Sequence, residues 1–166
     1  DEARSRKSSS VRSATNLPLL TMPIVVLGLN HRTAPVTLRE RFAFSEARVP
    51  AAMEQIRSAG IAEEVVILST CNRVEIYAST RLETRTAFED LQEFLVKLHD
   101  YRDPLTDELY RHGEPHSIEH LFRVASGMDS MVLGETEVLG QLKKAYDLAL
   151  QHKHTGPVLN KAFQMA

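Results

Sequence analysis

The feature that most restricts what this chain can fold into is the spacing of its apolar residues, which changes repeatedly from Met22 onward. Continuous apolar runs within residues 23–29 and 64–69 predict two buried strands. Apolar and polar residues alternate over residues 74–79, which predicts a third, half-exposed strand that forms a hairpin with the second. A fourth, short strand is expected over residues 109–112.

Two amphipathic helices are expected between these strands. Residues 45–58 place apolar side chains on one face, and Gly60 marks the end of that helix. Residues 84–99 show the clearest helical spacing in the chain. The resulting order is β-α-β-β-α-β, which predicts the α+β fold class with a ferredoxin-like antiparallel sheet.

The carboxyl-side part of the chain has a helical pattern throughout. Ser117 is expected to cap a helix that ends at Gly127, and a second helix is expected to run from Gly134 to the Gly-Pro pair at residues 156–157. Residues 157–166 begin a third amphipathic helix with no capping residue at its end. We therefore expect the sequence to be a fragment of a longer protein.

Length and charge exclude several classes of protein. A chain of 166 residues builds one hydrophobic core, and its longest apolar runs are strand-sized, so we predict one domain and no membrane span. Residues 1–21 carry four basic and two acidic side chains. The net charge of −2 for the whole chain therefore leaves −4 on the remainder. This acidic balance gives no support to nucleic-acid binding, although it leaves open a local basic patch on one face.

Residues 1–21 are rich in Ser and Arg and have no apolar period, so we predict a disordered extension. The composition is partly that of an organellar transit peptide, but the acidic pair Asp1-Glu2 does not fit one. Translated upstream sequence is the alternative interpretation.

Cys71 is the only cysteine, which excludes an internal disulfide and favours a reducing compartment. It follows a predicted strand in a polar connection, two residues before Arg73. A nearby guanidinium favours the reactive thiolate form, although a lone cysteine is more often a small buried residue. Both interpretations stay open on the spacing alone.

His120 is the second candidate for chemistry. If Ser117 is the cap, His120 lies in the first helical turn, off the apolar stripe, where the helix dipole disfavours the charged ring. A neutral imidazole accepts or relays a proton. The alternative is a surface histidine at a helix end.

Metal and nucleotide sites are poorly supported. His112 and His116 are four residues apart, but Gly113 and Pro115 interrupt the helix that would align them. Neither a dinucleotide fingerprint nor a P-loop motif occurs in the sequence. We predict no metal site and no cofactor-binding residues in this chain.

Four strings of residues resemble the amino-terminal catalytic domain of glutamyl-tRNA reductase. They are Leu27-Gly-Leu-Asn-His-Arg-Thr-Ala-Pro35, Arg39-Glu-Arg41, Leu68-Ser-Thr-Cys-Asn-Arg-Val-Glu75 and His120-Leu-Phe-Arg-Val-Ala-Ser-Gly-Met-Asp-Ser-Met-Val-Leu-Gly-Glu135. The likeness runs from Met22 to the end of the chain in the order and spacing of the family. It implies that residues 22–156 are the catalytic domain and that residues 157–166 begin a spine helix.

The resemblance also implies a reaction and a set of site residues. Family members reduce the glutamyl ester of glutamyl-tRNA with NADPH to glutamate 1-semialdehyde, in tetrapyrrole (porphyrin) biosynthesis. Cys71 matches the nucleophile that forms a thioester, and His120 matches a histidine important for activity. The implied substrate-binding residues are Thr70, Asn72, Arg73, Ser130, Glu135, Thr136, Glu137 and Gln141.

One local departure concerns Gly134-Glu-Thr-Glu137, where the family usually has Gly-Glu-Pro-Gln, so the roles of Thr136 and Glu137 are open. A larger departure is that the NADPH-binding and dimerisation domains of the family are missing from this sequence. The resemblance implies NADPH bound by the missing domain, a homodimer formed through the dimerisation domain, and glutamyl-tRNA as a partner. It also suggests glutamate 1-semialdehyde aminotransferase as a further partner.

The implied location is the cytoplasm, or the plastid stroma if residues 1–21 are a transit peptide. Two other functions remain open. A truncated relative would bind glutamyl-tRNA or a protein partner without chemistry. A Cys/His esterase would act on some other ester or amide.

Overall fold

The computed structural model describes residues 22–166, so the extension predicted at residues 1–21 lies outside the described part of the chain. Within it, four strands form one sheet in the order β2-β3-β1-β4, and every neighbouring pair is antiparallel. This order confirms the predicted ferredoxin-like arrangement of the α+β class. The strands are β1 (Ile24–Asn30), β2 (Glu64–Ser69), β3 (Arg73–Ser79) and β4 (Tyr110–His112).

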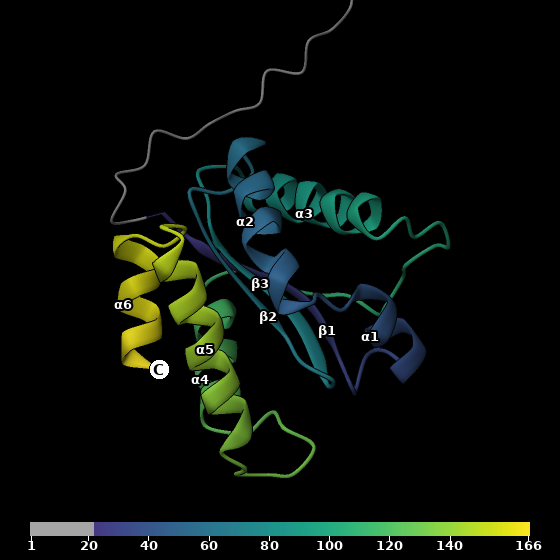
Figure 1. Cartoon of the computed structure of the whole chain (residues 1–166), viewed down its shortest axis with the longest axis vertical. Coiled ribbons are helices and arrows are strands. Elements are labelled where there is room, and N and C mark those ends of the chain that lie inside the picture. The colour runs from purple at the N-terminus through teal and green to yellow at the C-terminus, as the bar shows by residue number, and fades with distance from the viewer. Residues whose placement is uncertain (1–21) are drawn as a thin grey trace, which may run out of the picture.

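Helices lie on both sides of this sheet (Figure 1). Two of them, α2 and α3, pack on one side, where α2 contacts β2 and α3 contacts β1. Three others lie on the opposite side, where α4 contacts β1, α5 contacts β2, and α6 contacts β2 and β3. The helices are α1 (Val36–Phe42), the short 3-10 helix η2 (Glu46–Arg48), α2 (Val49–Ser58), α3 (Thr84–Leu98), α4 (His116–Ala125), α5 (Glu137–Gln151) and α6 (Pro157–Met165).

The prediction that the third strand is half-exposed was wrong. All seven residues of β3 are buried, including Glu75 and Tyr77, which have no exposed surface. Alternation of polar and apolar residues normally marks a sheet with one face in water. Here α4 and α6 cover the polar face, so its charged and hydroxyl groups are buried and bonded to one another.

The first half of the chain contains one helix that was not predicted, α1, which has only seven residues. Its Phe42 is fully buried and packs against the rings of His99 and Tyr101 at centroid distances of 5.4 and 4.9 Å. The helix predicted at residues 45–58 is present as η2 followed by α2. The helix predicted at residues 84–99 is α3.

Ser117 does not cap α4, which corrects the sequence-based prediction. The helix begins at His116, with Pro115 in the capping position, and the backbone N–H of Ser117 already donates to the carbonyl of Gly113. The side chain of Ser117 is fully buried. The next helix, α5, begins at Glu137 rather than near Gly134.

The last helix, α6, is held against the sheet by the buried carboxylate of Glu64. Its Oε1 accepts the backbone N–H groups of Gly156 and Leu159 at 2.6 and 2.9 Å, and Oε2 accepts that of Val158 at 3.2 Å. A carboxylate at this end satisfies free N–H groups and complements the helix dipole. The assignment of this segment to a spine helix stays a prediction.

None of the helices in the described residues is long and apolar enough to cross a membrane.

Candidate active site

The connection between β2 and β3 is a tight turn that presents Cys71 to solvent. The backbone N–H of Thr70 donates to the carbonyl of Arg73 at 2.8 Å, which closes the hairpin. The hydroxyl oxygen of Thr70 accepts the N–H groups of Asn72 and Arg73 at 3.1 and 3.2 Å. A threonine that binds the backbone two and three residues ahead stabilises a turn, so Thr70 fixes the position of the neighbouring thiol.

Beside this turn lies a hollow in which six of the predicted substrate-binding residues meet. Its volume is about 10 Å³, room for one water molecule, so a glutamyl group needs this hollow to open. The β2–β3 turn, the loop that follows α4 and the helix α5 all contribute to it. Its lining residues are Thr70, Asn72, Arg73, Ser130, Met131, Glu135, Val138 and Gln141.

Gly127 explains how Ser130 and Glu135 reach the hollow together. It has a φ of +75°, and a Cβ atom on it would lie 2.5 Å from the carbonyl oxygen of Glu135. Its own carbonyl accepts the N–H groups of Ser130 and Gly134 at 3.3 and 3.2 Å. Only glycine permits both this backbone angle and this close approach, so Gly127 closes the loop between α4 and α5.

Arg73 forms the buried wall of the hollow. Only 1% of its surface is exposed, and its Nη1 atom lies 2.7 Å from Glu75 Oε1 and 3.0 Å from Asp129 Oδ2. Its Nη2 atom donates to the backbone carbonyl of Asp129 at 2.7 Å. Burial by itself lowers the pKa of Arg73, but its partners, chiefly the carboxylate of Glu75, raise that pKa by a larger amount. The guanidinium therefore stays charged.

These contacts hold the guanidinium of Arg73 on the inner side of β3, whereas Cys71 is exposed at the turn. The sequence-based idea that this guanidinium activates the thiol therefore receives no support from the geometry. An arginine side chain has five N–H donors, and the three contacts with Glu75 and Asp129 leave others for a substrate.

Glu75 links Arg73 to His120, and the sequence analysis missed it. Its Oε2 atom lies 2.8 Å from His120 Nε2 and accepts the hydroxyl of Tyr77 at 2.5 Å. Burial raises the pKa of Glu75, but the bonds to His120 and Arg73 outweigh it and lower that pKa to about 2. The sequence did contain a signal for the burial of Glu75. Three helices are expected after the ferredoxin-like unit, and they must cover the second face of the sheet.

His120 is buried, with 8% of its surface exposed, so the prediction that it lies off the apolar stripe was wrong. It is the fifth residue of α4 and faces the sheet, where its ring contacts the rings of Tyr110 and His112 at centroid distances of 5.2 and 4.8 Å. A carboxylate beside Nε2 favours the tautomer with hydrogen on that atom. In that tautomer the Nδ1 atom carries the free lone pair of the ring.

Thr136 and Glu137 are exposed at the start of α5 and do not line the hollow. Their assignment to substrate binding stays a prediction. Within residues 22–166 there is no group of three or more His, Cys, Asp or Glu side chains arranged to hold a metal ion.

The fold and the site define an α+β domain of the ferredoxin-like class with an exposed cysteine beside a hollow walled by a buried arginine. Residues 27–166 match the family described as "Glutamyl-tRNAGlu reductase, N-terminal domain". The chain belongs to this family.

Individual relatives agree with this assignment. The chain is 45% identical over 146 residues to "Glutamyl-tRNA reductase" of Pelotomaculum thermopropionicum, covering 87% of this chain and 33% of that protein. It is 44% identical over 143 residues to the protein of the same description from Xanthomonas campestris pv. phaseoli, covering 86% and 32%. The solved structure "Glutamyl-tRNA Reductase from Methanopyrus kandleri" has a TM-score of 0.71 at 32% identity, covering 86% and 32%. The chain therefore spans about a third of the length of these relatives.

Proposed function

We propose that this chain is the acyl-accepting part of a glutamyl-tRNA reductase, in which Cys71 takes the glutamyl group from glutamyl-tRNA as a thioester. The full reaction would supply glutamate 1-semialdehyde for tetrapyrrole biosynthesis. The observation that carries this proposal is the hollow beside the exposed thiol. Its lining unites the neighbours of Cys71 in the turn with Ser130, Glu135 and Gln141 from remote parts of the chain.

In this step the sulfur of Cys71 attacks the ester carbonyl carbon. A carbon–sulfur bond forms, and the bond between the carbonyl carbon and the terminal ribose oxygen breaks. The ribose oxygen leaves with a proton that originates on the thiol. We assign this proton transfer to His120, because the bond from Glu75 fixes the orientation of its ring.

The charges around the hollow suit a glutamyl group. Arg73 offers a fixed cation to the side-chain carboxylate of the substrate, and a bidentate pair is the strongest form of such a contact. Glu135 offers a carboxylate to the substrate α-ammonium group. The two sites lie in the same small hollow, which matches the short distance between the two charges of glutamate.

Reduction of the thioester requires a hydride donor, which is NADPH in the enzymes that this chain resembles. Dinucleotides bind at the carboxyl ends of parallel strands, where a glycine-rich turn opens a helix. Between residues 22 and 166 all strand pairs are antiparallel, and the sequence contains no such turn. These residues do not fit NADPH, and we assign its binding to another part of a longer protein.

The test is to incubate the chain with glutamyl-tRNA and to measure its intact mass and the loss of the ester. We expect an adduct of one glutamyl group on Cys71 that water slowly releases, so that ester loss is faster than with Cys71→Ser. Because Cys71 is exposed, the variant should keep the melting temperature of the parent. An adduct on another residue, or equal rates for the two proteins, would contradict the proposal. Binding of glutamyl-tRNA without an adduct would favour a non-catalytic relative.

Partners and location are proposed from the same resemblance. We place glutamate 1-semialdehyde aminotransferase next in the reaction sequence, and we place homodimer formation in another part of the longer protein. The single free cysteine fits a reducing compartment, such as a bacterial cytoplasm or, if residues 1–21 are a transit peptide, the plastid stroma.

A further inference from the structure

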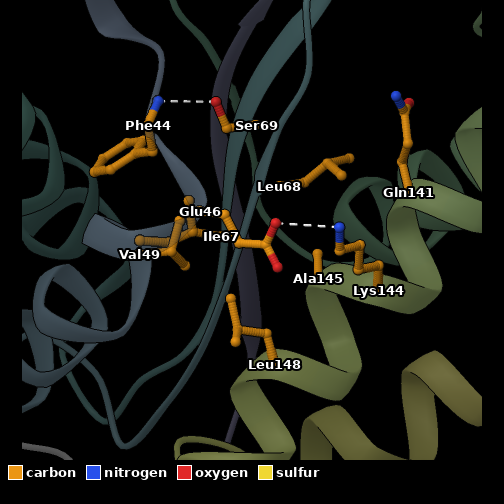
Figure 2. A pocket seen from close by; sticks show the side chains of 10 residues that line it. All are labelled: Phe44, Glu46, Val49, Ile67, Leu68, Ser69, Gln141, Lys144, Ala145 and Leu148. Atoms are coloured by element: carbon orange, nitrogen blue, oxygen red, sulfur yellow. Dashed lines mark hydrogen bonds and ion pairs between the residues drawn. The ribbon is translucent and has the colours of Figure 1, made fainter.

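A second cavity lies next to the candidate active site, at the open edge of the sheet. Its volume is about 210 Å³, and it lies between α2 and α5 along the outer side of β2 (Figure 2). Ligand pockets for drug-sized molecules begin at roughly 300 Å³, so this cavity suits a smaller molecule. It is lined by Phe44, Glu46, Val49, Ile67, Leu68, Ser69, Gln141, Lys144, Ala145 and Leu148.

The cavity adjoins the active-site hollow. Gln141 lines both of them. Ser69 lines the cavity and is two residues from Cys71, about 7 Å along an extended chain. A molecule with its glutamyl group in the hollow and its ester at Cys71 therefore has its other end at this cavity.

The strand edge inside the cavity offers hydrogen-bonding groups. In an antiparallel pair, every second residue directs its N–H and C=O groups away from the partner strand. The N–H of Val65 donates to the carbonyl of His154 at 2.9 Å, on the side away from β3, which identifies the outward set. Ile67 and Ser69 belong to the same set, and no backbone partner for their N–H groups occurs within the described segment.

The side of the cavity opposite the strand edge is formed by helices and is mostly apolar. Val49, Ala145 and Leu148 contribute apolar surface from the helices, and an exposed ion pair between Glu46 and Lys144, 3.1 Å long, bridges them (Figure 2). Exposed ion pairs contribute little to stability, so a ligand phosphate can replace Glu46 as the partner of Lys144 with little loss of stability.

We propose that this cavity binds the terminal adenosine of the aminoacylated RNA, with the base against the apolar side chains and the edge of β2, and the adjoining phosphate near Lys144. This inference rests on the proposed function. A nucleobase has a flat apolar face and a polar edge, which matches apolar helix surface beside free backbone groups. A peptide strand is the other occupant considered, but two outward residues are too few for strand addition.

The experiment compares two acyl donors, glutamyl-tRNA and the α-phenyl ester of glutamate, which lacks the nucleoside. In the variant Ala145→Phe the new ring fills the cavity. We expect acylation of Cys71 by glutamyl-tRNA to fall about tenfold or more, with the phenyl ester unaffected. The matched control is Leu150→Phe, since Leu150 is exposed on the same helix outside the cavity. It should change neither rate.

A second pair of variants tests the phosphate contact. Lys144→Ala should lower acylation by glutamyl-tRNA a few-fold at low salt and have less effect at high salt, whereas Lys143→Ala should not. Adenosine 5′-monophosphate should also inhibit the parent chain against glutamyl-tRNA more strongly than cytidine 5′-monophosphate.

The outcomes separate the two proposals. If the parent chain is acylated by neither donor, the proposed function fails. If both donors work but Ala145→Phe slows both equally, or slows neither, the adenosine site is overturned. Should Ala145→Phe unfold, Ala145→Leu and Lys144→Ala give the same comparison, and equal effects on both donors overturn the inference.

Discussion

The two faces of strand β3 are equally buried, but they are held by different interactions. Val74, Ile76 and Ala78 place hydrocarbon on the face directed toward α2 and α3. On the other face, Arg73, Glu75 and Tyr77 bind one another, His120 and Asp129. Buried hydrocarbon tolerates small changes in shape, whereas buried charges require every partner to stay in place.

This difference explains where the candidate site lies. Charges buried on the α4 side hold the cation of Arg73 in the wall of the hollow and link it through Glu75 to the imidazole of His120, at positions that a solvent-exposed face would not hold. Groups that are held in position before the substrate arrives favour catalysis. The apolar face has no comparable groups and serves stability. The predictions below test this division between the two faces.

The largest expected effect is that of Glu75→Gln, which removes the charge with almost no change in shape. We expect a loss of about 2–4 kcal/mol in the free energy of unfolding, because Arg73 and His120 lose their shared partner in a buried site. Acylation of Cys71 by glutamyl-tRNA should also fall. Urea unfolding and the intact-mass assay measure the two effects.

The matched control for Glu75→Gln is Ile76→Val on the opposite face of the same strand. Removal of one methylene group there should cost about 0.5–1.5 kcal/mol and leave the acylation rate unchanged. If both variants lose the same stability and the same activity, the two faces do not differ as described.

The next effect concerns Gly28 in β1, which lies opposite Glu75. A Cβ atom at Gly28 would come within 2.8 Å of both Glu75 Cγ and the carbonyl oxygen of Val74. Gly28→Ala should therefore destabilise the protein by about 1–3 kcal/mol through overpacking. Thermal unfolding measures this loss.

Gly140→Ala is the control for Gly28→Ala, because Gly140 lies in helix α5 with nothing within 4 Å of the added atom. It should stabilise the protein by about 0.5–1 kcal/mol, since alanine favours a helix. The two glycine-to-alanine substitutions should thus change the free energy of unfolding in opposite directions. If both substitutions changed the stability in the same direction, the space around Glu75 would not be what restricts residue 28.

The smallest effect is a pH dependence of stability that separates the two faces. His99, on the α3 side, has its pKa lowered from 6.5 to about 4 by burial and by Arg48 and Arg41. The unfolded chain therefore binds this proton more readily than the folded chain. Stability from the neutral ring is complete above pH 6.5 and declines as the pH falls through 6.5 toward 4.

Glu75 affects the stability at lower pH than His99 does. Its pKa is lowered from 4.5 to about 2, so its contribution is complete above pH 4.5 and is lost as the pH falls toward 2. Urea titrations across this range should show that His99→Phe reduces the first decline and that Glu75→Gln reduces the second. If His99→Phe leaves the decline between pH 6.5 and 4 intact, the burial of His99 is not its cause.

Local patterns predicted the elements well and the burial poorly. The strand at residues 64–69, the turn around Cys71 and the helix at residues 84–99 all occur where apolar period and turn residues indicated. The helix α1 was not predicted, because two helical turns contain too few apolar residues to show a helical period. Ser117 was misassigned because a serine before an apolar stripe resembles a cap even when the helix begins one residue earlier.

The amino-acid sequence by itself determined the order of strands and helices, the thiol at a tight turn and the family to which the chain belongs. Those properties depend on neighbouring residues or on long strings of matching residues. The tertiary structure alone decided that Glu75 and His120 are buried and bonded, and that residues 70–73 and 130–141, which are distant in sequence, share one hollow. Burial and contact across the sheet depend on which helices cover which face, and no local pattern carries that information.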